Sequence, residues 1–282
     1  MGLKPGPLIL PLLLQLLVIT ACTAPPDQLN TPKKELPVTV QDGYEIPMFP
    51  TSRDQLNFAK SGFTDKKLKM AAYRAVLAQF PKDKLERGHA AIGLAYLHLE
   101  PDYRFASPLE IRKAANDFEA VIKDYSALPD VLAKAHWYLG WIYTDLMKAP
   151  ERGLVHYWQI VQDFSDIPMN LSPPVPWVNL VYPAQQTMTD RKPEGPHKLW
   201  AEAALLEIVR NAGSKSIAIQ AFTLLYDRFF SSPSTGLALK AMLADRELAA
   251  HALPLVEPYL SRNTANPYLV RDIQALADKA GL

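Results

Sequence analysis

The 282-residue sequence contains a single cysteine, Cys22. A chain with one thiol cannot form an internal disulfide, so packing alone must hold its folded part together. Long runs of like charge are also missing, and the formal net charge is only +1. The chain therefore offers no basic stripe for nucleic acid and no acidic tail for a cationic partner.

Sequence patterns that carry catalysis are missing too. The chain has no glycine-rich phosphate loop, no Gly-x-Ser-x-Gly nucleophile elbow and no His-Glu-x-x-His metal motif. Its six histidines are scattered, and His89 and His136 occupy equivalent positions of a repeat, where packing between helices explains them better than metal binding. The sequence predicts a protein that is not an enzyme and has no metal or cofactor.

The one long apolar run lies near the N-terminus, at residues 8–19, and follows Lys4. It is too short to cross a bilayer comfortably and has the length of a signal-peptide core. The run ends in Ile-Thr-Ala followed by Cys22, which resembles the lipobox of bacterial lipoproteins. That resemblance implies a signal peptide at 1–21 and a lipidated Cys22. The alternative is an ordinary secretory cleavage, with Cys22 incidental.

Acyl chains on Cys22 would hold the mature protein on a membrane, because each buried CH₂ adds ~0.8 kcal/mol. The next residue is Thr23 rather than aspartate. By resemblance to enterobacterial lipoproteins, this favours the periplasmic face of the outer membrane over retention in the inner membrane. We therefore expect a lipid-anchored protein of the bacterial cell envelope.

Prolines divide the rest of the chain. Residues 22–52 hold six prolines among polar residues and are expected to form a flexible tether. Helical periodicity is expected over 53–165 and again over 197–282, where the last helix, at about 267–280, would close the end of the fold with its polar face. Seven prolines interrupt the pattern at 166–196, which predicts an insertion that lies on the helices or only covers apolar side chains.

A short phrase occurs twice, at 117–129 and 156–168, with an offset of 39 residues. Each copy contains an aromatic residue, a β-branched pair, an Asp-aromatic-Ser triplet and a final proline. Looser copies lie around 73–81 and 222–229. A period of 30 to 50 residues is typical of stacked helical hairpins, since no single hairpin buries its apolar face alone.

Two stretches identify the repeat more closely. Leu139-Gly140-x-x-Tyr143, followed by Gly153, Tyr157 and Pro168, resembles the tetratricopeptide repeat, and so does the stretch that begins Ile92-Gly93-x-x-Tyr96. The match departs from the family pattern by about nine extra residues around 100–108, by glycine rather than alanine at 153, and by histidine at the usual tryptophan position. The resemblance implies an all-α fold, a right-handed α-solenoid of tetratricopeptide-like hairpins.

Aromatic-proline endings behind a lipobox and a proline-rich tether also resemble BamD-type lipoproteins of outer-membrane biogenesis. This resemblance implies a scaffold that holds a protein or peptide partner during envelope assembly or secretion. Two alternatives stay open. One is a non-catalytic or degenerate peptidoglycan-processing solenoid, related to the superhelical domain of lytic transglycosylases. The other is a binder of small ligands, which would need a closed apolar pocket.

In the tetratricopeptide family the first helix of each hairpin lines a concave groove. Carried over through Gly93 and Gly140, the resemblance implies partner-binding positions on two helices: Arg87, Leu94, Leu97, His98, Lys134, Trp137, Trp141 and Asp145. Aromatic and arginine side chains are common interface anchors. The alternative for Trp137 and Trp141 is that they pack under the insertion at 166–196.

Overall fold

The computed structural model describes five stretches of the chain, residues 36–61, 65–100, 102–169, 199–263 and 266–281. The described residues from Pro37 onwards belong to one compact unit. The predicted signal peptide, the lipidation site Cys22 and all but the start of the insertion at 166–196 lie outside the described residues.

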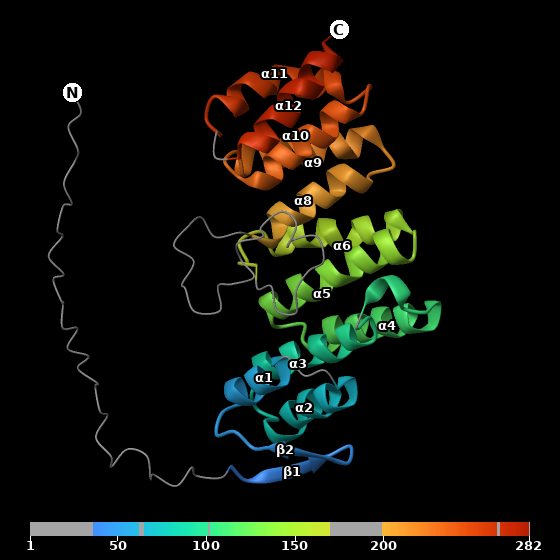
Figure 1. The fold of residues 1–282 in the computed structure, drawn as a ribbon, viewed down its shortest axis with the longest axis vertical. Coiled ribbons are helices and arrows are strands. Elements are labelled where there is room, and N and C mark those ends of the chain that lie inside the picture. The colour runs from blue at the N-terminus through green and yellow to red at the C-terminus, as the bar shows by residue number, and fades with distance from the viewer. Residues whose placement is uncertain (1–35, 62–64, 101, 170–198, 264–265, 282) are drawn as a thin grey trace, which may run out of the picture. The chain divides into compact units, whose positions relative to one another are not determined.

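Eleven α-helices account for most of the described chain, which confirms the all-α fold class (Figure 1). The helices up to the insertion are α1 (Ser52–Lys60), α2 (Lys66–Gln79), α3 (Lys84–Leu97), α4 (Pro108–Asp124), α5 (Pro129–Trp141) and α6 (Pro150–Asp163). Those after it are α8 (Trp200–Asn211), α9 (Lys215–Arg228), α10 (Pro233–Ala244), α11 (Ala249–Leu260) and α12 (Pro267–Ala280). A 3₁₀ turn, η2 (Tyr103–Phe105), precedes α4, and a π-helical turn, η3 (Ile142–Leu146), continues α5.

Local sequence explains where α4 begins. The Ser107 hydroxyl accepts a hydrogen bond from the backbone N–H of Glu110, and the Glu110 carboxylate accepts one from the backbone N–H of Ser107. Pro108 occupies the first helical position, where its missing N–H costs nothing. This reciprocal capping box fixes the start of the helix.

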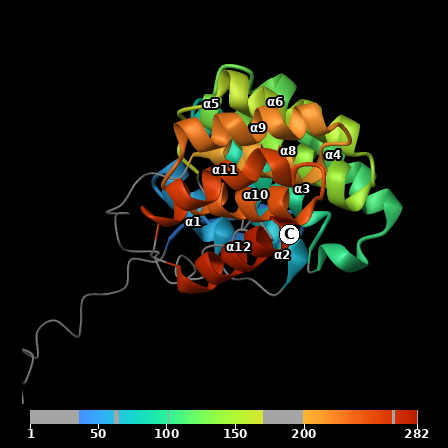
Figure 2. The ribbon, with the colours of Figure 1, turned by 90° about the horizontal axis from the view of Figure 1, so that it is seen from above.

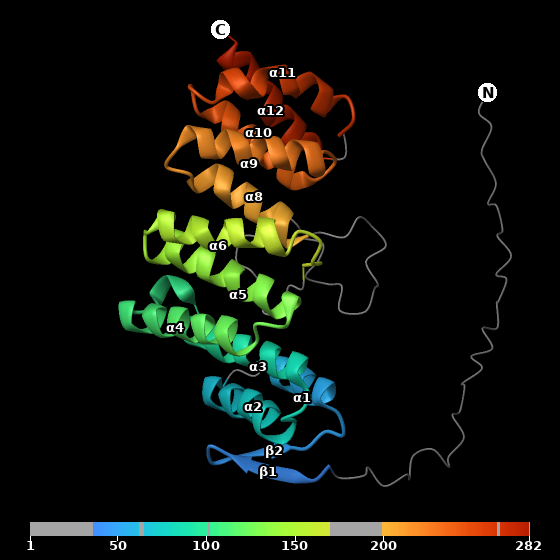
Figure 3. The same cartoon turned by 180° about the vertical axis from the view of Figure 1, so that it is seen from behind.

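Each helix packs against the next one along the chain, as the views from the front and the back show (Figures 1 and 3). A second set of contacts joins every other helix, α1 with α3, α3 with α5, α5 with α8, α8 with α10, and α10 with α12. We call these six the alternate helices. In the view from above, α11 and α12 lie at the near end of the series (Figure 2).

Three hydrophobic clusters follow one another along the unit. The first joins the strands, α1, α2 and α3, the second joins α3, α4 and α5, and the third runs from α5 to α12. Helices α3 and α5 each contribute to two clusters, on different faces. Consecutive helices are therefore stabilised by burial against their neighbours along the chain.

A β-hairpin corrects the expected boundary of the tether. Strands β1 (Val38–Gln41) and β2 (Tyr44–Pro47) pair antiparallel and pack on α2, and Ile46 is fully buried. Asp42 and Gly43 form the turn with φ of 52° and 83°. An Asp-Gly pair between two apolar strands is the strongest short-range hairpin signal. Residues 38–47 thus belong to the folded unit, whereas 22–52 were expected to be tether.

The same close contact, a tyrosine ring seated on a glycine of a neighbouring helix, occurs three times. Tyr73 of α2 lies on Gly93 of α3, Tyr157 of α6 on Gly140 of α5, and Tyr259 of α11 on Gly236 of α10. In each case a Cβ on the glycine would collide with the ring or its hydroxyl. Small residues therefore let these helix pairs approach closely, with an aromatic ring filling the space.

Candidate functional site

The residues expected to line a groove on α3 do not share one environment. Arg87 and Leu94 are half-buried, whereas Leu97 is 1% exposed and belongs to the hydrophobic cluster with α1 and α2. His98 lies towards α4, where its Nε2 is 3.0 Å from Oδ2 of Asp117. Leu97 is therefore a core residue and not an accessible binding residue, which corrects that prediction.

The α5 positions are also mostly buried. Lys134 and Trp137 have no exposed surface, and Trp141 is 3% exposed. The Trp137 indole lies between two aromatic rings, with centroids 5.2 Å from Tyr157 and 5.7 Å from Trp200. The expectation that two indoles face a partner across an open groove is therefore wrong. Of the four predicted positions from 134 to 145, only Asp145 is exposed.

Trp141 packs against Tyr103, one of the extra residues around 100–108. The ring of Tyr103, in η2, meets the Trp141 indole edge to face, with centroids 5.0 Å apart and an interplanar angle of 80°. The extra residues around 100–108 thus shield this indole from solvent. The alternative covering, by the insertion at 166–196, lies outside the described residues apart from its first four positions.

Charged side chains from three alternate helices meet beside Lys134. The cluster contains Lys60 at the end of α1, Glu86 and His89 on α3, and Asp130 and Lys134 on α5. Nε2 of His89 lies 2.9 Å from Oδ2 of Asp130, and His89 is 9% exposed. Arg53 approaches Glu86 at 4.0 Å from the exposed edge. We call Lys60, Glu86, His89, Asp130 and Lys134 the α1–α3–α5 ionic cluster.

Burial changes the protonation of this ionic cluster. Removal from water, with a smaller contribution from the charge of Lys60, lowers the pKa of Lys134 to about 7, and Asp130 opposes the change. Burial also lowers the pKa of Lys60, against the attraction of Asp130 and Glu86. Burial acts to raise the pKa of Asp130, but the hydrogen bond and charge of His89 outweigh it, so that this pKa is lowered. A buried amine that titrates near neutrality is unusual and marks either a functional site or a structural ion network.

A second polar group lies where η3 meets α8. The Glu207 carboxylate accepts a hydrogen bond from Arg210 at 3.1 Å and another from the side-chain amide of Asn211 at 3.1 Å. Burial raises the pKa of Glu207, with Arg210 opposing and Asp145 adding to the rise. Asp145 is exposed as a residue, yet its carboxylate is partly desolvated, which raises its pKa as well.

The backbone next to this group has an uncommon form. The N–H of Met147 bonds to the carbonyl of Ile142 at 2.8 Å, so the turn is one residue wider than an α-helical turn. Thr144 is bound back to the carbonyl of Gly140 at 2.9 Å. π-Helical turns inside α-helices are often found at functional sites. The sequence pattern over 130–146 does not predict this π-helical turn.

Two histidines face each other between α5 and α6. Nδ1 of His136 lies 3.0 Å from Nδ1 of His156, so one ring donates and the other accepts. Burial lowers the pKa of both rings to about 4; for His136 the charge of His156 adds to this effect, and for His156 that of Arg152 does. The His156 ring also stacks on Tyr143, with centroids 5.6 Å apart. The repeat pattern predicts that His136 packs between helices but does not identify its partner.

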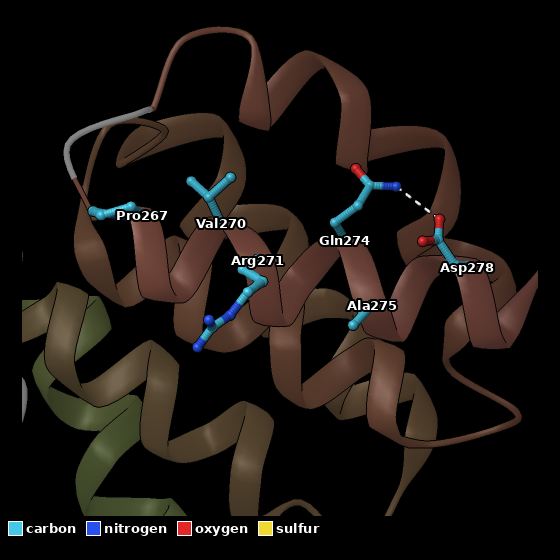
Figure 4. Close-up of a pocket in the computed structure, with 6 residues that line it drawn as sticks. All are labelled: Pro267, Val270, Arg271, Gln274, Ala275 and Asp278. Carbon is cyan, nitrogen blue, oxygen red and sulfur yellow. Dashed lines mark hydrogen bonds between the residues drawn. The ribbon is translucent and has the colours of Figure 1, made fainter.

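A surface depression lies on α12 (Figure 4). Its lining comes from one stripe of that helix, Pro267, Val270, Arg271, Gln274, Ala275 and Asp278. The Gln274 amide donates to the Asp278 carboxylate at 2.8 Å. The polar face predicted for the last helix is mostly exposed, but Asp272 faces α10, where it pairs with Lys240 at 2.6 Å. None of the eight predicted groove residues lines this depression.

The described residues show no cluster of three or more histidine, cysteine or acidic side chains placed to bind a metal ion. Nor does the described part of the chain contain a helix with the length and apolarity needed to span a membrane.

The fold and these sites define an all-α protein of consecutively packed helices with polar clusters between the alternate helices. Comparison with family models, with curated proteins and with solved structures gave no match.

Proposed function

We propose that this chain is a lipid-anchored scaffold of the bacterial envelope, built as a right-handed solenoid of tetratricopeptide-like hairpins, that binds a protein or peptide partner. The proposal rests on one repeated contact, in which a tyrosine ring packs against a glycine of a neighbouring helix, at Gly93, Gly140 and Gly236. Tyrosine–glycine packing in three pairs of consecutive helices favours a chain built from related hairpins. Such chains serve mainly as binding surfaces.

The alternate helices provide the best candidate for the binding face. They contact one another from α1 to α12 and carry both polar groups described above, the α1–α3–α5 ionic cluster and the group around Glu207. Of the predicted groove residues, two keep charged side chains that are at least partly exposed: Arg87 on α3, which is half-buried, and Asp145 in η3, which continues α5. Charged rim residues set the specificity and rate of association more than its strength.

The test is affinity capture after chemical crosslinking in envelopes. Arg87→Ala and Asp145→Ala should each reduce the amount of captured partner several-fold. The matched control is Lys123→Ala, which removes an exposed charge from α4, a helix outside the alternate series. If Arg87→Ala and Asp145→Ala both retain every partner that the Lys123→Ala chain retains, the assignment of the binding face is wrong.

A further inference from the structure

The most exposed large apolar side chain among the described residues belongs to Phe105, at 84%. It sits in η2, within the extra residues that interrupt the first tetratricopeptide-like hairpin. Leu109, the second residue of α4, is 56% exposed. Two large apolar side chains exposed four residues apart can form part of an interaction surface. We call Phe105 and Leu109 the 105/109 tip.

The 105/109 tip is held rigidly. Asp102 accepts hydrogen bonds from the backbone N–H of Arg104 at 3.0 Å and from its guanidinium at 2.6 Å. The neighbouring Tyr103 is anchored on the Trp141 indole. On the other side, the Ser107–Glu110 capping box fixes the start of α4. Phe105 is therefore presented by an ordered turn, and little conformational entropy would be lost when it binds.

Two exposed cations lie close to the tip in sequence. Arg112 and Lys113 are exposed on α4 and form no ion pair with any residue that the structure describes. Of the three acids nearest in sequence, Asp102 pairs with Arg104 and Asp117 with His98, while Glu110 accepts a hydrogen bond from the backbone N–H of Ser107. An apolar tip with free cations beside it matches the interface of an anionic bilayer, where apolar side chains enter the acyl boundary and cations meet the headgroups.

We propose that the 105/109 tip is a second membrane contact, in which Phe105 and Leu109 insert into an anionic lipid surface while Arg112 and Lys113 bind its headgroups. The choice of a lipid surface over an acidic protein rests on the proposed lipid anchor, which would keep this tip near a bilayer. Fourteen residues lie between Cys22 and Pro37, and a chain of that length spans at most ~50 Å.

The test uses the full chain in a Cys22→Ser background. Because the chain has no other cysteine, a new one can be labelled alone. An environment-sensitive fluorophore is attached at Phe105→Cys or, as control, at Val155→Cys, which is 64% exposed on α6. Each labelled chain is titrated with vesicles of phosphatidylcholine alone or mixed with phosphatidylglycerol. The apolar run at 8–19 is present in both chains, so any binding by that run affects both alike.

Anionic vesicles should shift the emission of the label at position 105 to shorter wavelength and leave that at 155 unchanged. Arg112→Gln and Lys113→Gln should each weaken this response about fivefold, since one cation near an anionic surface contributes about 1 kcal/mol. With the label moved to Leu109→Cys, Phe105→Ser should abolish the shift. No shift at 105, or an equal shift at 155, would overturn the proposal. Since Cys22 is absent throughout, failure of the lipid anchor would leave this readout intact.

Discussion

Tyr157 occupies the space that a side chain at position 140 would need. A Cβ placed on Gly140 would lie 2.5 Å from Cε1 and 2.7 Å from Cζ of Tyr157, which is closer than real Cβ contacts. The ring cannot withdraw easily, because it is fully buried and also lies against Trp137. The approach of α5 to α6 therefore depends on the absence of one methyl group.

Gly140→Ala should lower the free energy of unfolding by ~1–3 kcal/mol, the usual cost of overpacking a core. Denaturant unfolding followed by circular dichroism measures the change. Gly213→Ala is the control, since a Cβ there meets no atom within 4 Å. It should be neutral or slightly stabilising, because alanine restricts the unfolded chain. Equal destabilisation by both variants would contradict the close-contact explanation.

Trp141 contributes to stability rather than to a binding surface. Trp141→Ala should cost ~3–5 kcal/mol, because it removes a buried indole and leaves a cavity. Tyr103→Ala should cost less, since Tyr103 is half-buried and covers only one edge of the indole. Thermal unfolding of the two variants, with exposed Leu109→Ala as control, measures the order. If Trp141→Ala leaves the stability unchanged, the indole does not stabilise the fold and is again a candidate binding residue.

The His136–His156 pair makes stability depend on pH. Both rings have a pKa of about 4 in the folded protein and 6.5 as the ordinary value, so the unfolded chain binds protons more readily between these values. The stability is complete above pH 6.5 and is lost as the pH falls towards 4. The expected loss is about 1–2 kcal/mol, after allowing for the partial exposure of the rings.

Urea unfolding between pH 4 and 7 measures this loss. His156→Phe keeps a ring stacked on Tyr143 but removes one titrating group, so the slope of stability against pH should decrease. His251→Phe replaces an exposed histidine and should leave the slope unchanged. An identical slope in all three proteins would show that other groups cause the acid sensitivity.

Lipidation at Cys22 remains a prediction, and Cys22→Ser tests it. Without the thiol no diacylglyceryl group can be attached, and the variant should move from the membrane fraction to the soluble periplasmic fraction. The 105/109 tip alone provides too little apolar area for durable binding, just as a single acyl chain does. Full retention in the membrane fraction would contradict the lipid anchor.

Local patterns in the sequence were sufficient to place the helical regions and the last helix. The Ser107-Pro108 start of α4 follows from capping chemistry, and α12 was expected at about 267–280 and spans Pro267–Ala280. The Asp42-Gly43 turn carried an equally clear signal, but the many prolines around it led the hairpin to be read as tether. Helices and hairpins can therefore be predicted from sequence wherever a capping or turn residue favours one local structure strongly.

The accessible binding face could not be predicted in the same way. Repeat positions indicate which helix side a residue occupies, but burial depends on neighbours distant in sequence. Trp200 covers Trp137 from α8, and Tyr103 covers Trp141 from an insertion that the repeat pattern does not contain. The pairing of His136 with His156 across α5 and α6 also depends on side-chain direction, which spacing alone does not fix.

Site-specific photocrosslinking in intact cells is the sharpest test of whether the alternate helices bind a partner. A photoreactive amino acid is placed at Arg87, Asp145 or Lys123 and activated by light, and the adducts are compared on a gel. We expect the same partner adduct from positions 87 and 145 and none from position 123. Adducts from 123 alone, or equal adducts from all three positions, would contradict it.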